Sequence, residues 1–443
     1  MATAETTGVQ DLCSPKQMRK RARRFAVLMF VINYVRVTTD SLAAHLKHVA
    51  AQSDARTKSR WTLLLQSLKY TLAAQLVTVA EYLICLVKPR LAARIARLLV
   101  WKAHQVRADL AYGDHPRHRM DLYGVQTDSK QPPRPVLVFV HGGAWAFGHK
   151  WQYGLVGEFL SKHGLLVAVI NYRTFPVGTV LDMVHDVEDA VHWLADNAAS
   201  FGGDAKRMYL SGHSAGAHLC ALALARAGQI GDANEVAASE LSRDIRTHVR
   251  AFIGMSGPYD VEDHYVFESK RVMGPLRGEA AHLDRVHEIS PMKPAMQGLE
   301  SFRQHSPTGL VVTEAAAGNA MKLPRFHIIH GSEDKWVPSS SSAKLVEALQ
   351  QVQVDAEFHE INNCTHEEVM FALMGEPSHV QDELLSHIHR VRYVVAAMTK
   401  TEDRQLVQQV VLVLFAICYT WVTAISLSVY NKHLIQQYDP RTP

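Results

Sequence analysis

Few cysteines occur in the 443-residue sequence, and their spacing suits neither a disulfide framework nor a metal site. The five residues are scattered and include no Cys-x-x-Cys pair: Cys13, Cys85, Cys220, Cys364 and Cys418. An odd, scattered set favours reduced thiols and a catalytic domain in a reducing compartment. The 25 histidines lack a His-Glu-x-x-His pattern, so we expect no metal and no other cofactor.

A strong charge excess is also missing, as are internal repeats and low-complexity tracts. The formal net charge is only +4, with 47% hydrophobic and 20% charged residues. So diffuse a positive charge does not indicate a nucleic-acid partner, and the hydrophobic content excludes general disorder. The length allows one large α/β domain with appended segments.

The N-terminal region, residues 1–99, does not begin like a secretory signal peptide but is expected to associate with a membrane. A basic run precedes the apolar run 25–35, which is too short to cross a bilayer and suits an interfacial helix. The segment 61–87 is the best candidate for a transmembrane helix here. Lys69 and Glu81 within it leave an amphipathic surface helix as the alternative.

The C-terminal region, residues 401–443, contains an uncharged run at 410–430. Its 21 residues are long enough for a transmembrane helix, and a buried core helix is the alternative. Basic residues at 88–107 and before residue 410 flank the central domain. The positive-inside rule therefore places that domain in the cytoplasm.

Residues 100–400 show the alternation of strands and helices that is typical of a mostly parallel α/β sheet. Continuous apolar runs predict buried strands at 136–140 and 165–172, and further buried strands are expected at 249–255, 325–330 and 356–361. A strand is also expected at 118–123, and a helix at 182–197. Residues 261–321 look irregular and proline-rich, and we expect a cap-like insertion over the active-site mouth. The alternative is that residues 261–321 form a surface segment with no role in substrate binding.

The motif G-x-S-x-G occurs at residues 212–216, between an apolar run at 207–210 and a helical pattern at 217–227. Strand, tight turn and helix in this order predict a nucleophile elbow that exposes the hydroxyl of Ser214. A lone motif of this kind can arise by chance. Here a His-Gly-Gly segment precedes it, and an acid and a histidine follow in the order of the α/β-hydrolase fold.

A serine hydroxyl needs a base within hydrogen-bond reach and a carboxylate that orients the base. Asp334 follows a predicted strand and is the expected acid, with its neighbour Glu333 as the competitor. His366 is expected on a loop after the last strand and is the candidate base. His359 lies within that strand and is expected to be structural.

The developing oxyanion needs preorganised hydrogen-bond donors. Residues 141–145 (HGGAW) end a buried strand and resemble the H-G-G-G-type loop, with backbone N–H groups available. His141 of this loop and His213 of the elbow are expected to orient the two loops. The residues expected to bind the oxyanion or the substrate are Gly142, Gly143, Ala144, His213 and Ala215.

These motifs resemble those of the hormone-sensitive-lipase-like α/β-hydrolases, and more closely those of the isoprenylcysteine α-carbonyl methylesterases. The resemblance covers about residues 100–375. It rests on residues 112–123 (YGDHPRHRMDLY), 141–150 (HGGAWAFGHK), 171–176 (NYRTFP), 202–204, 207–218, 255–259, 263–264, 299–312 (LESFRQHSPTGLVV) and 330–338 (HGSEDKWVP). It implies a membrane-bound esterase of the endoplasmic reticulum and Golgi that demethylates prenylcysteine methyl esters. The family's triad corresponds to Ser214, Asp334 and His366.

Other functions stay open at this point. The stretch GHSAGAH is also typical of kynurenine formamidases, and a general lipid or carboxylesterase would use the same motifs. A non-catalytic receptor with this fold is a more distant alternative, since the candidate triad is complete. A prenyl chain would need an apolar pocket, for which the sequence offers Tyr259, His264, Tyr265, Phe267 and Phe302.

Overall fold

The computed structural model describes residues 106–390 apart from Ser129, 230–243 and 271–291, and six isolated positions. These positions are Thr39, Ala43, Ala44, Lys47, Arg94 and Leu98. The expected membrane segments 25–35, 61–87 and 410–430 lie outside the described residues, as do the domain boundaries near residues 100 and 400. Within the described residues, no helix combines the length and the apolar character needed to cross a bilayer.

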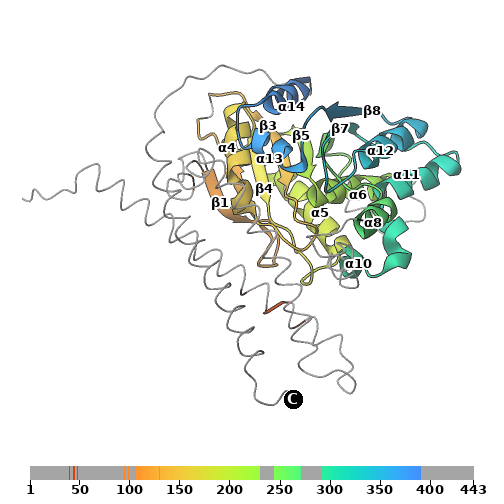
Figure 1. Cartoon of the computed structure of the whole chain (residues 1–443). Helices are drawn as coiled ribbons and strands as arrows, with labels where there is room; N and C mark the ends of the chain where they lie inside the picture. The colour runs from red at the N-terminus through yellow and green to blue at the C-terminus, as the bar shows by residue number, and fades with distance from the viewer. Residues whose placement is uncertain are drawn as a thin grey trace, which may run out of the picture. The chain divides into compact units, whose positions relative to one another are not determined.

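The described residues form an eight-stranded sheet in the order β1-β2-β4-β3-β5-β6-β7-β8 (Figure 1). The strands are β1 (Val106–Ala111), β2 (Arg119–Tyr123), β3 (Arg134–Val140), β4 (Leu166–Ile170), β5 (Gly203–His213), β6 (Val249–Met255), β7 (Arg325–Gly331) and β8 (Ala356–Ile361). Strand β2 pairs antiparallel with β1 and β4, and the strands from β4 to β8 pair in parallel. The prediction of a mostly parallel α/β sheet is confirmed.

Strand β1 was not predicted from the sequence. Its side chains alternate between half-buried and exposed along the strand. The alternation arises because β1 is an edge strand, whose outer face meets water. Its residues VRADLA therefore resemble the end of the basic segment 88–107 rather than one of the continuous apolar runs of the central strands.

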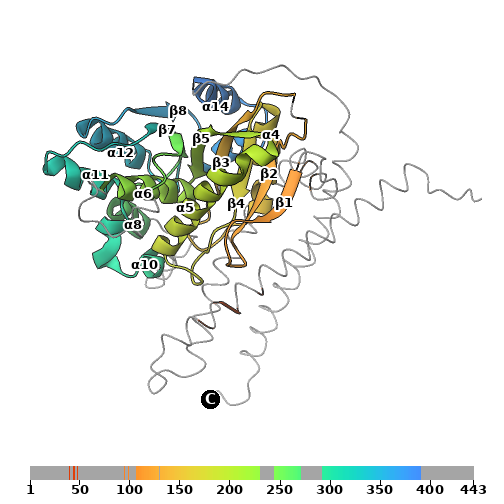
Figure 2. The ribbon, with the colours of Figure 1, turned by 180° about the vertical axis from the view of Figure 1, so that it is seen from behind.

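Helices cover both faces of the sheet. One face carries α5 (Val180–Asn197), α6 (Ala215–Gln229), α11 (Pro307–Ala316) and α12 (Ser340–Gln351), which pack against one another and against the strands (Figure 2). The other face carries α4 (Gly154–Lys162), α13 (His366–Leu373) and α14 (His379–Arg390). The short helix η1 (Lys150–Tyr153) precedes α4, and η2 (Ala198–Phe201) follows α5.

Residues 261–321 are largely helical where the structure describes them, so the expectation of an irregular segment is wrong. They contain α8 (Val261–Lys270), α10 (Met292–Ala295), η4 (Leu299–His305) and α11. The prolines misled the reading because one of them begins a helix instead of breaking it. Pro307 is the first residue of α11, where its missing N–H costs nothing, and the Ser306 side chain accepts from the Gly309 N–H as a cap.

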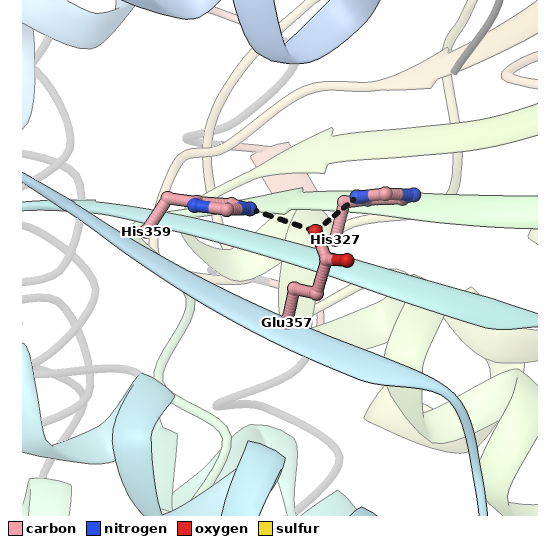
Figure 3. A group of neighbouring side chains, drawn as sticks. All are labelled: His327, Glu357 and His359. Atoms are coloured by element: carbon pink, nitrogen blue, oxygen red, sulfur yellow. Dashed lines mark hydrogen bonds and ion pairs between the residues drawn. The ribbon is translucent and has the colours of Figure 1, made fainter. Parts of the chain in front are cut away.

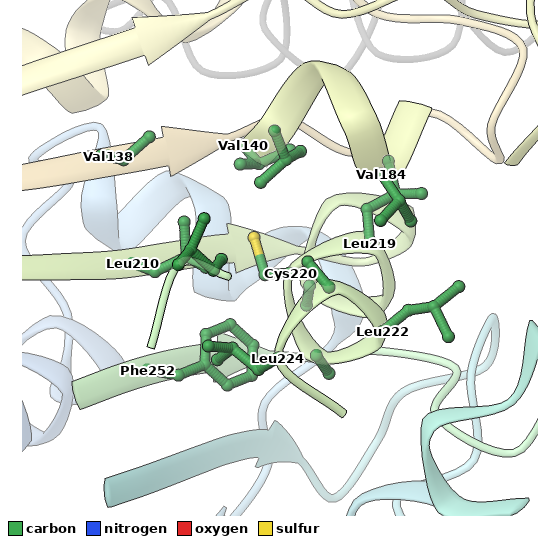
Figure 4. Packing of buried hydrophobic residues seen from close by; sticks show 14 of the residues in the cluster. Val138, Val140, Val184, Leu210, Leu219, Cys220, Leu222, Leu224 and Phe252 are labelled. Carbon is green, nitrogen blue, oxygen red and sulfur yellow. The ribbon is translucent and has the colours of Figure 1, made fainter. Parts of the chain in front are cut away.

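The core beneath the elbow is formed by α6 packed on the central strands (Figure 4). Leu219 and Cys220 of α6 are completely buried, as are Leu210 of β5 and Val140 of β3. Removing a side chain such as that of Leu210 would cost about 2–5 kcal/mol of stability. This packing fixes where α6 begins and therefore holds the turn before it.

Candidate active site

Ser214 occupies the sharp turn between β5 and α6 and is partly exposed. Its φ of 54° lies in the left-handed region, which is uncommon for a residue with a side chain and costs roughly 1–3 kcal/mol. The turn is possible because Gly216 has no side chain. A Cβ at that position would lie only 2.2 Å from the carbonyl oxygen of Val140. This is the strand–turn–helix geometry that the G-x-S-x-G motif predicts.

The loop after β3 turns back against the elbow. Gly142 is in close contact with it, since a Cβ on Gly142 would lie 3.1 Å from the Cβ of Ser214. Gly143, Ala144 and Trp145 follow with φ values of 127°, 45° and 60°. Consecutive backbone N–H groups in left-handed turns can converge on one concavity that accepts an anion. Within the described residues, the N–H groups of Gly143 and Ala144 donate to no other backbone acceptor.

Ala215 adds a third potential donor. It is the first residue of α6, and an N–H at this position has no acceptor within its own helix. The first turn of a helix also favours negative charge. The loop after β3 and the start of α6 therefore present backbone donors close to the serine.

Trp145 anchors the loop to the interior. Its indole Nε1–H donates to Nδ1 of His218 (3.1 Å), and the backbone N–H of Phe175 donates to the Trp145 carbonyl (2.8 Å). The other nitrogen of His218 lies 2.7 Å from the carbonyl oxygen of His305. Burial lowers the pKa of His218 to about 3. A neutral imidazole thus bridges the loop to η4.

His141, the first residue of the loop, is a buried support and not a base. Its ring stacks on Tyr172 and Tyr153, with centroids 4.4 and 5.5 Å away. Its Nδ1 lies 2.8 Å from the carbonyl oxygen of Gly142. Burial lowers the pKa of His141 to about 3, so the ring is neutral and holds the loop, as expected from the sequence.

Asp334 lies in the turn after β7, and its side chain is completely buried. Its Oδ1 accepts the backbone N–H groups of Trp336 (2.8 Å) and Val337 (2.9 Å). Its Oδ2 lies 2.6 Å from Nδ1 of His366 and 3.1 Å from Nε2 of His330. Burial alone would raise the pKa of this carboxyl, but the two histidines and their hydrogen bonds outweigh it and lower the pKa well below its usual range.

The competing acid is placed differently. Glu333 is exposed, whereas the neighbouring Asp334 carboxylate faces inward to His366. The structure therefore brings Asp334, and not Glu333, into contact with the candidate base. Trp336, two residues after Asp334, donates its Nε1–H to Oε1 of Glu367, the neighbour of His366 (2.7 Å).

His366 is the first residue of α13 and does not lie on a loop as expected. The helix begins here because Thr365 and Glu368 form a capping box, in which each side chain accepts the other's backbone N–H. The Nδ1 of His366 faces Asp334, which leaves Nε2 for a second partner. The capping box thus fixes the backbone from which the imidazole projects.

His213 ties the elbow to His366. Its Nε2 lies 3.1 Å from the carbonyl oxygen of His366, and the two rings are 4.6 Å apart. Burial, followed by the charge of His366, lowers the pKa of His213 well below its ordinary value. His213 is therefore neutral, and its contact brings the candidate base beside the residue that precedes Ser214.

His330 was missed by the sequence reading. It is fully buried, with Nδ1 2.7 Å from the Ser342 hydroxyl and Nε2 3.0 Å from the Val337 carbonyl as well as 3.1 Å from Asp334. When the Ser342 hydroxyl donates to Nδ1, the His330 ring carries its proton on Nε2, and this N–H is directed at the Asp334 carboxylate. The available signal was a histidine at the carboxyl end of a buried parallel strand, where ligands of α/β folds gather.

Two of the aromatic residues expected to form a prenyl pocket lie in the core instead. Tyr259 and Phe302 belong to the hydrophobic core, so neither lines an open pocket. They were misassigned because large aromatic residues fill cores as readily as binding sites. His264 is also buried, whereas Tyr265 and Phe267 of α8 are half-buried and can still contact a bound molecule.

The sheet order, the serine in a left-handed turn, and the acid and histidine after β7 and β8 define the chain as an α/β-hydrolase. A family model described as BD-FAE matches residues 120–349. Among solved structures, the chain is similar to "ESTERASE B from Lactobacillus Rhamnosis (HN001)", with a TM-score of 0.51 at 15% identity. That match covers 72% of this chain and 94% of the other and shows the shared fold.

Curated relatives are more informative than the fold. The chain is 33% identical to the "Probable isoprenylcysteine alpha-carbonyl methylesterase ICMEL2" of Arabidopsis thaliana, over 79% of this chain and 78% of the relative. It is 36% identical to the corresponding ICMEL1 protein of Oryza sativa subsp. japonica, over 64% of this chain and 63% of that relative's length. The chain belongs to the isoprenylcysteine α-carbonyl methylesterase family, within the hormone-sensitive-lipase-like α/β-hydrolases.

Proposed function

We propose that the protein is a serine carboxylesterase that hydrolyses the methyl ester of C-terminal prenylcysteines. Ser214 is the nucleophile, His366 the general base and acid, and Asp334 the carboxylate that orients the histidine. The observation that carries the proposal is the 2.6 Å contact between Asp334 and His366 beside the elbow, in a chain of the methylesterase family.

In the first half-reaction, Ser214 Oγ attacks the ester carbonyl carbon while its proton passes to Nε2 of His366. Asp334 accepts the Nδ1–H and stabilises the imidazolium that forms. The oxygen that becomes negative accepts N–H groups from Gly143, Ala144 and Ala215. The intermediate then expels methoxide, which takes the proton from His366 and leaves as methanol.

In the second half-reaction, water attacks the acyl-serine and gives its proton to His366. Collapse of the intermediate breaks the bond to Ser214 Oγ, which recovers the proton from the histidine. The products are the free carboxylate of the prenylcysteine and the original enzyme. No cofactor is needed for this sequence of steps.

Apolar side chains on residues 261–321 support a prenyl or other lipid substrate. Val266, Leu299 and Val312 are 49%, 43% and 42% exposed, so their side chains are available for contact with a bound molecule. Each CH2-sized group that they help to bury would contribute roughly 0.8 kcal/mol. This is why a long isoprenoid chain, rather than a small soluble ester, fits the proposal.

The test compares farnesylcysteine methyl ester, short-chain methyl esters and N-formylkynurenine on the purified full chain. We expect kcat/KM to rise steeply with chain length and Phe267→Ala to flatten that rise, while Val177→Ala, an exposed valine outside the segment, leaves it unchanged. Faster turnover of N-formylkynurenine than of any prenyl ester would replace the proposal with a formamidase. If kcat/KM does not depend on the chain length of the ester, the protein is a general carboxylesterase instead.

The proposal also includes attachment to the membranes of the endoplasmic reticulum and Golgi, with the catalytic domain facing the cytoplasm. Attachment and orientation rest on the apolar segments 61–87 and 410–430 and on the basic residues beside them. The two compartments are those that the family resemblance implies. A glycosylation acceptor placed after Lys432 should be modified, and one within residues 261–321 should not. The opposite pattern would reverse the orientation.

A further inference from the structure

Strands β7 and β8 bring together two histidines and a glutamate that are not part of the proposed triad (Figure 3). His327 belongs to β7, and Glu357 and His359 belong to β8. One ligand atom from each residue lies within 4.8 Å of the others. The sequence predicts no metal site, and it misses this cluster because some thirty residues separate His327 from Glu357, so that no compact spacing motif exists.

The sheet itself creates the cluster. Residues two apart in a strand share a face, which places Glu357 and His359 side by side. The parallel register pairs His327 directly with Glu357 across the two strands. As a result, Oε2 of Glu357 lies 3.2 Å from Nε2 of His359 and 3.7 Å from Nδ1 of His327.

These separations suit a small transition-metal ion. Ligands about 2.0–2.1 Å from Zn²⁺ in tetrahedral geometry lie about 3.3–3.4 Å from one another. The carboxylate oxygen already sits at nearly that distance from both imidazole nitrogens. Two imidazoles and one carboxylate form a donor set that zinc accepts, with a fourth position left for water.

The surrounding residues orient the ligands. Arg325 pairs with Oε1 of Glu357 and, through Nε, with Asp355 at 3.2 Å. Holding Oε1 leaves Oε2 directed at the histidines, and outer partners of this kind position metal ligands. The arginine carries one positive charge and the two carboxylates carry two negative charges, so the group retains one negative charge for a cation.

Packing restrains the histidines as well. The ring of His359 stacks on His387 of α14, with centroids 3.9 Å apart. The side chain of His327 is nearly buried, while that of Glu357 is 36% exposed. An ion can therefore reach the cluster from the solvent at the glutamate, and the two rings have little freedom to lose when it binds.

We propose that His327, Glu357 and His359 bind a zinc-like divalent cation, which cross-links β7 to β8. Strand β7 leads to Asp334 and strand β8 to His366, so the ion would hold the two strands whose ends carry the acid and the base. The ion stabilises this edge of the sheet and takes no part in the chemistry at Ser214.

The experiment uses the full chain without a histidine tag and titrates it with Zn²⁺, with Mg²⁺ as the hard-cation control. We expect one zinc per chain by calorimetry and elemental analysis, and a rise in Tm of several degrees with Zn²⁺ only. His359→Asn and Glu357→Gln should each weaken zinc binding by about tenfold or more and abolish the Tm shift. Both variants should keep the kcat/KM of the metal-free enzyme.

Two controls separate this site from other histidines. His248→Asn removes a histidine that packs on His192 and is not one of the proposed ligands, and it should leave zinc binding unchanged. His366→Asn removes the candidate base and should also leave binding unchanged. If His366→Asn abolishes binding, or if His359→Asn and Glu357→Gln bind zinc as the unmodified chain does, the proposal is wrong.

Discussion

Replacing Asp334 by asparagine is the sharpest test of the proposed triad, because the surroundings dictate how the amide would sit. The Oδ1 position accepts two backbone N–H groups, from Trp336 and Val337. An NH2 group placed there would face two donors, so the amide oxygen must occupy this position. The amide NH2 then points to His366 and His330 at the former Oδ2 position.

This orientation reverses the hydrogen bond to the base. The amide donates to Nδ1 of His366, which must then offer a lone pair and carry its proton on Nε2. A protonated Nε2 cannot accept the proton of Ser214. The variant also loses the negative charge that stabilises the imidazolium. For triads of this type the combined loss is on the order of 10⁴ in kcat, or about 5.5 kcal/mol of transition-state stabilisation.

The measurement is kcat/KM for p-nitrophenyl acetate, together with the rate of fluorophosphonate labelling at Ser214. Glu333→Gln is the matched control, since it removes the exposed neighbouring carboxylate, and it should stay within about twofold of the unmodified enzyme. Melting curves establish that both variants fold. A loss below tenfold for Asp334→Asn, or an equal loss for Glu333→Gln, would refute the assignment of the acid.

Further outcomes are expected from other residues of the site. Ser214→Ala should abolish phosphonate labelling and reduce ester turnover by about 10⁴–10⁶-fold, leaving the melting temperature nearly unchanged. His330→Asn should lower kcat roughly tenfold with little effect on KM, because Asp334 loses one donor, and Ser342→Ala should have a smaller effect. The stability of the fold should fall as the pH drops below about 6.5, because buried His218, with its pKa near 3, stays neutral while the unfolded chain binds a proton. Urea denaturation at pH 7 and at pH 5 measures the loss of unfolding free energy, to which His218 contributes about 2 kcal/mol at most. His218→Gln should make this loss smaller.

The elements that sequence reasoning located well are those whose pattern is local. β6 and β8 begin and end at the residues predicted for them, and the helix predicted at 182–197 begins two residues earlier, after its Thr179 cap. The elbow was recognisable because its two glycines are required by contacts within a few residues or with the adjacent strand. Continuous burial and close backbone approach leave a signature in the residues themselves.

What the sequence did not reveal depends on how strands pair, how turns close and which aromatic side chains the core buries. The cluster of His327, Glu357 and His359 exists only through the register of β7 against β8. The contact of His330 with Asp334 depends on how the turn after β7 closes. Tyr259 and Phe302 were assigned to a pocket because composition cannot tell a core aromatic residue from a pocket aromatic residue.

The same register governs the catalytic geometry. Asp334 follows β7 and His366 follows β8, and these strands pair in parallel from Phe326 with Ala356 to Gly331 with Ile361. A slip of one residue would displace one strand by about 3.3 Å and turn its side chains to the opposite face. The hydrogen bond of 2.6 Å between Asp334 and His366 could not survive that displacement. The pairing of these two strands at the edge of the sheet is therefore part of the candidate active site, although none of the paired residues touches the substrate in the proposed mechanism.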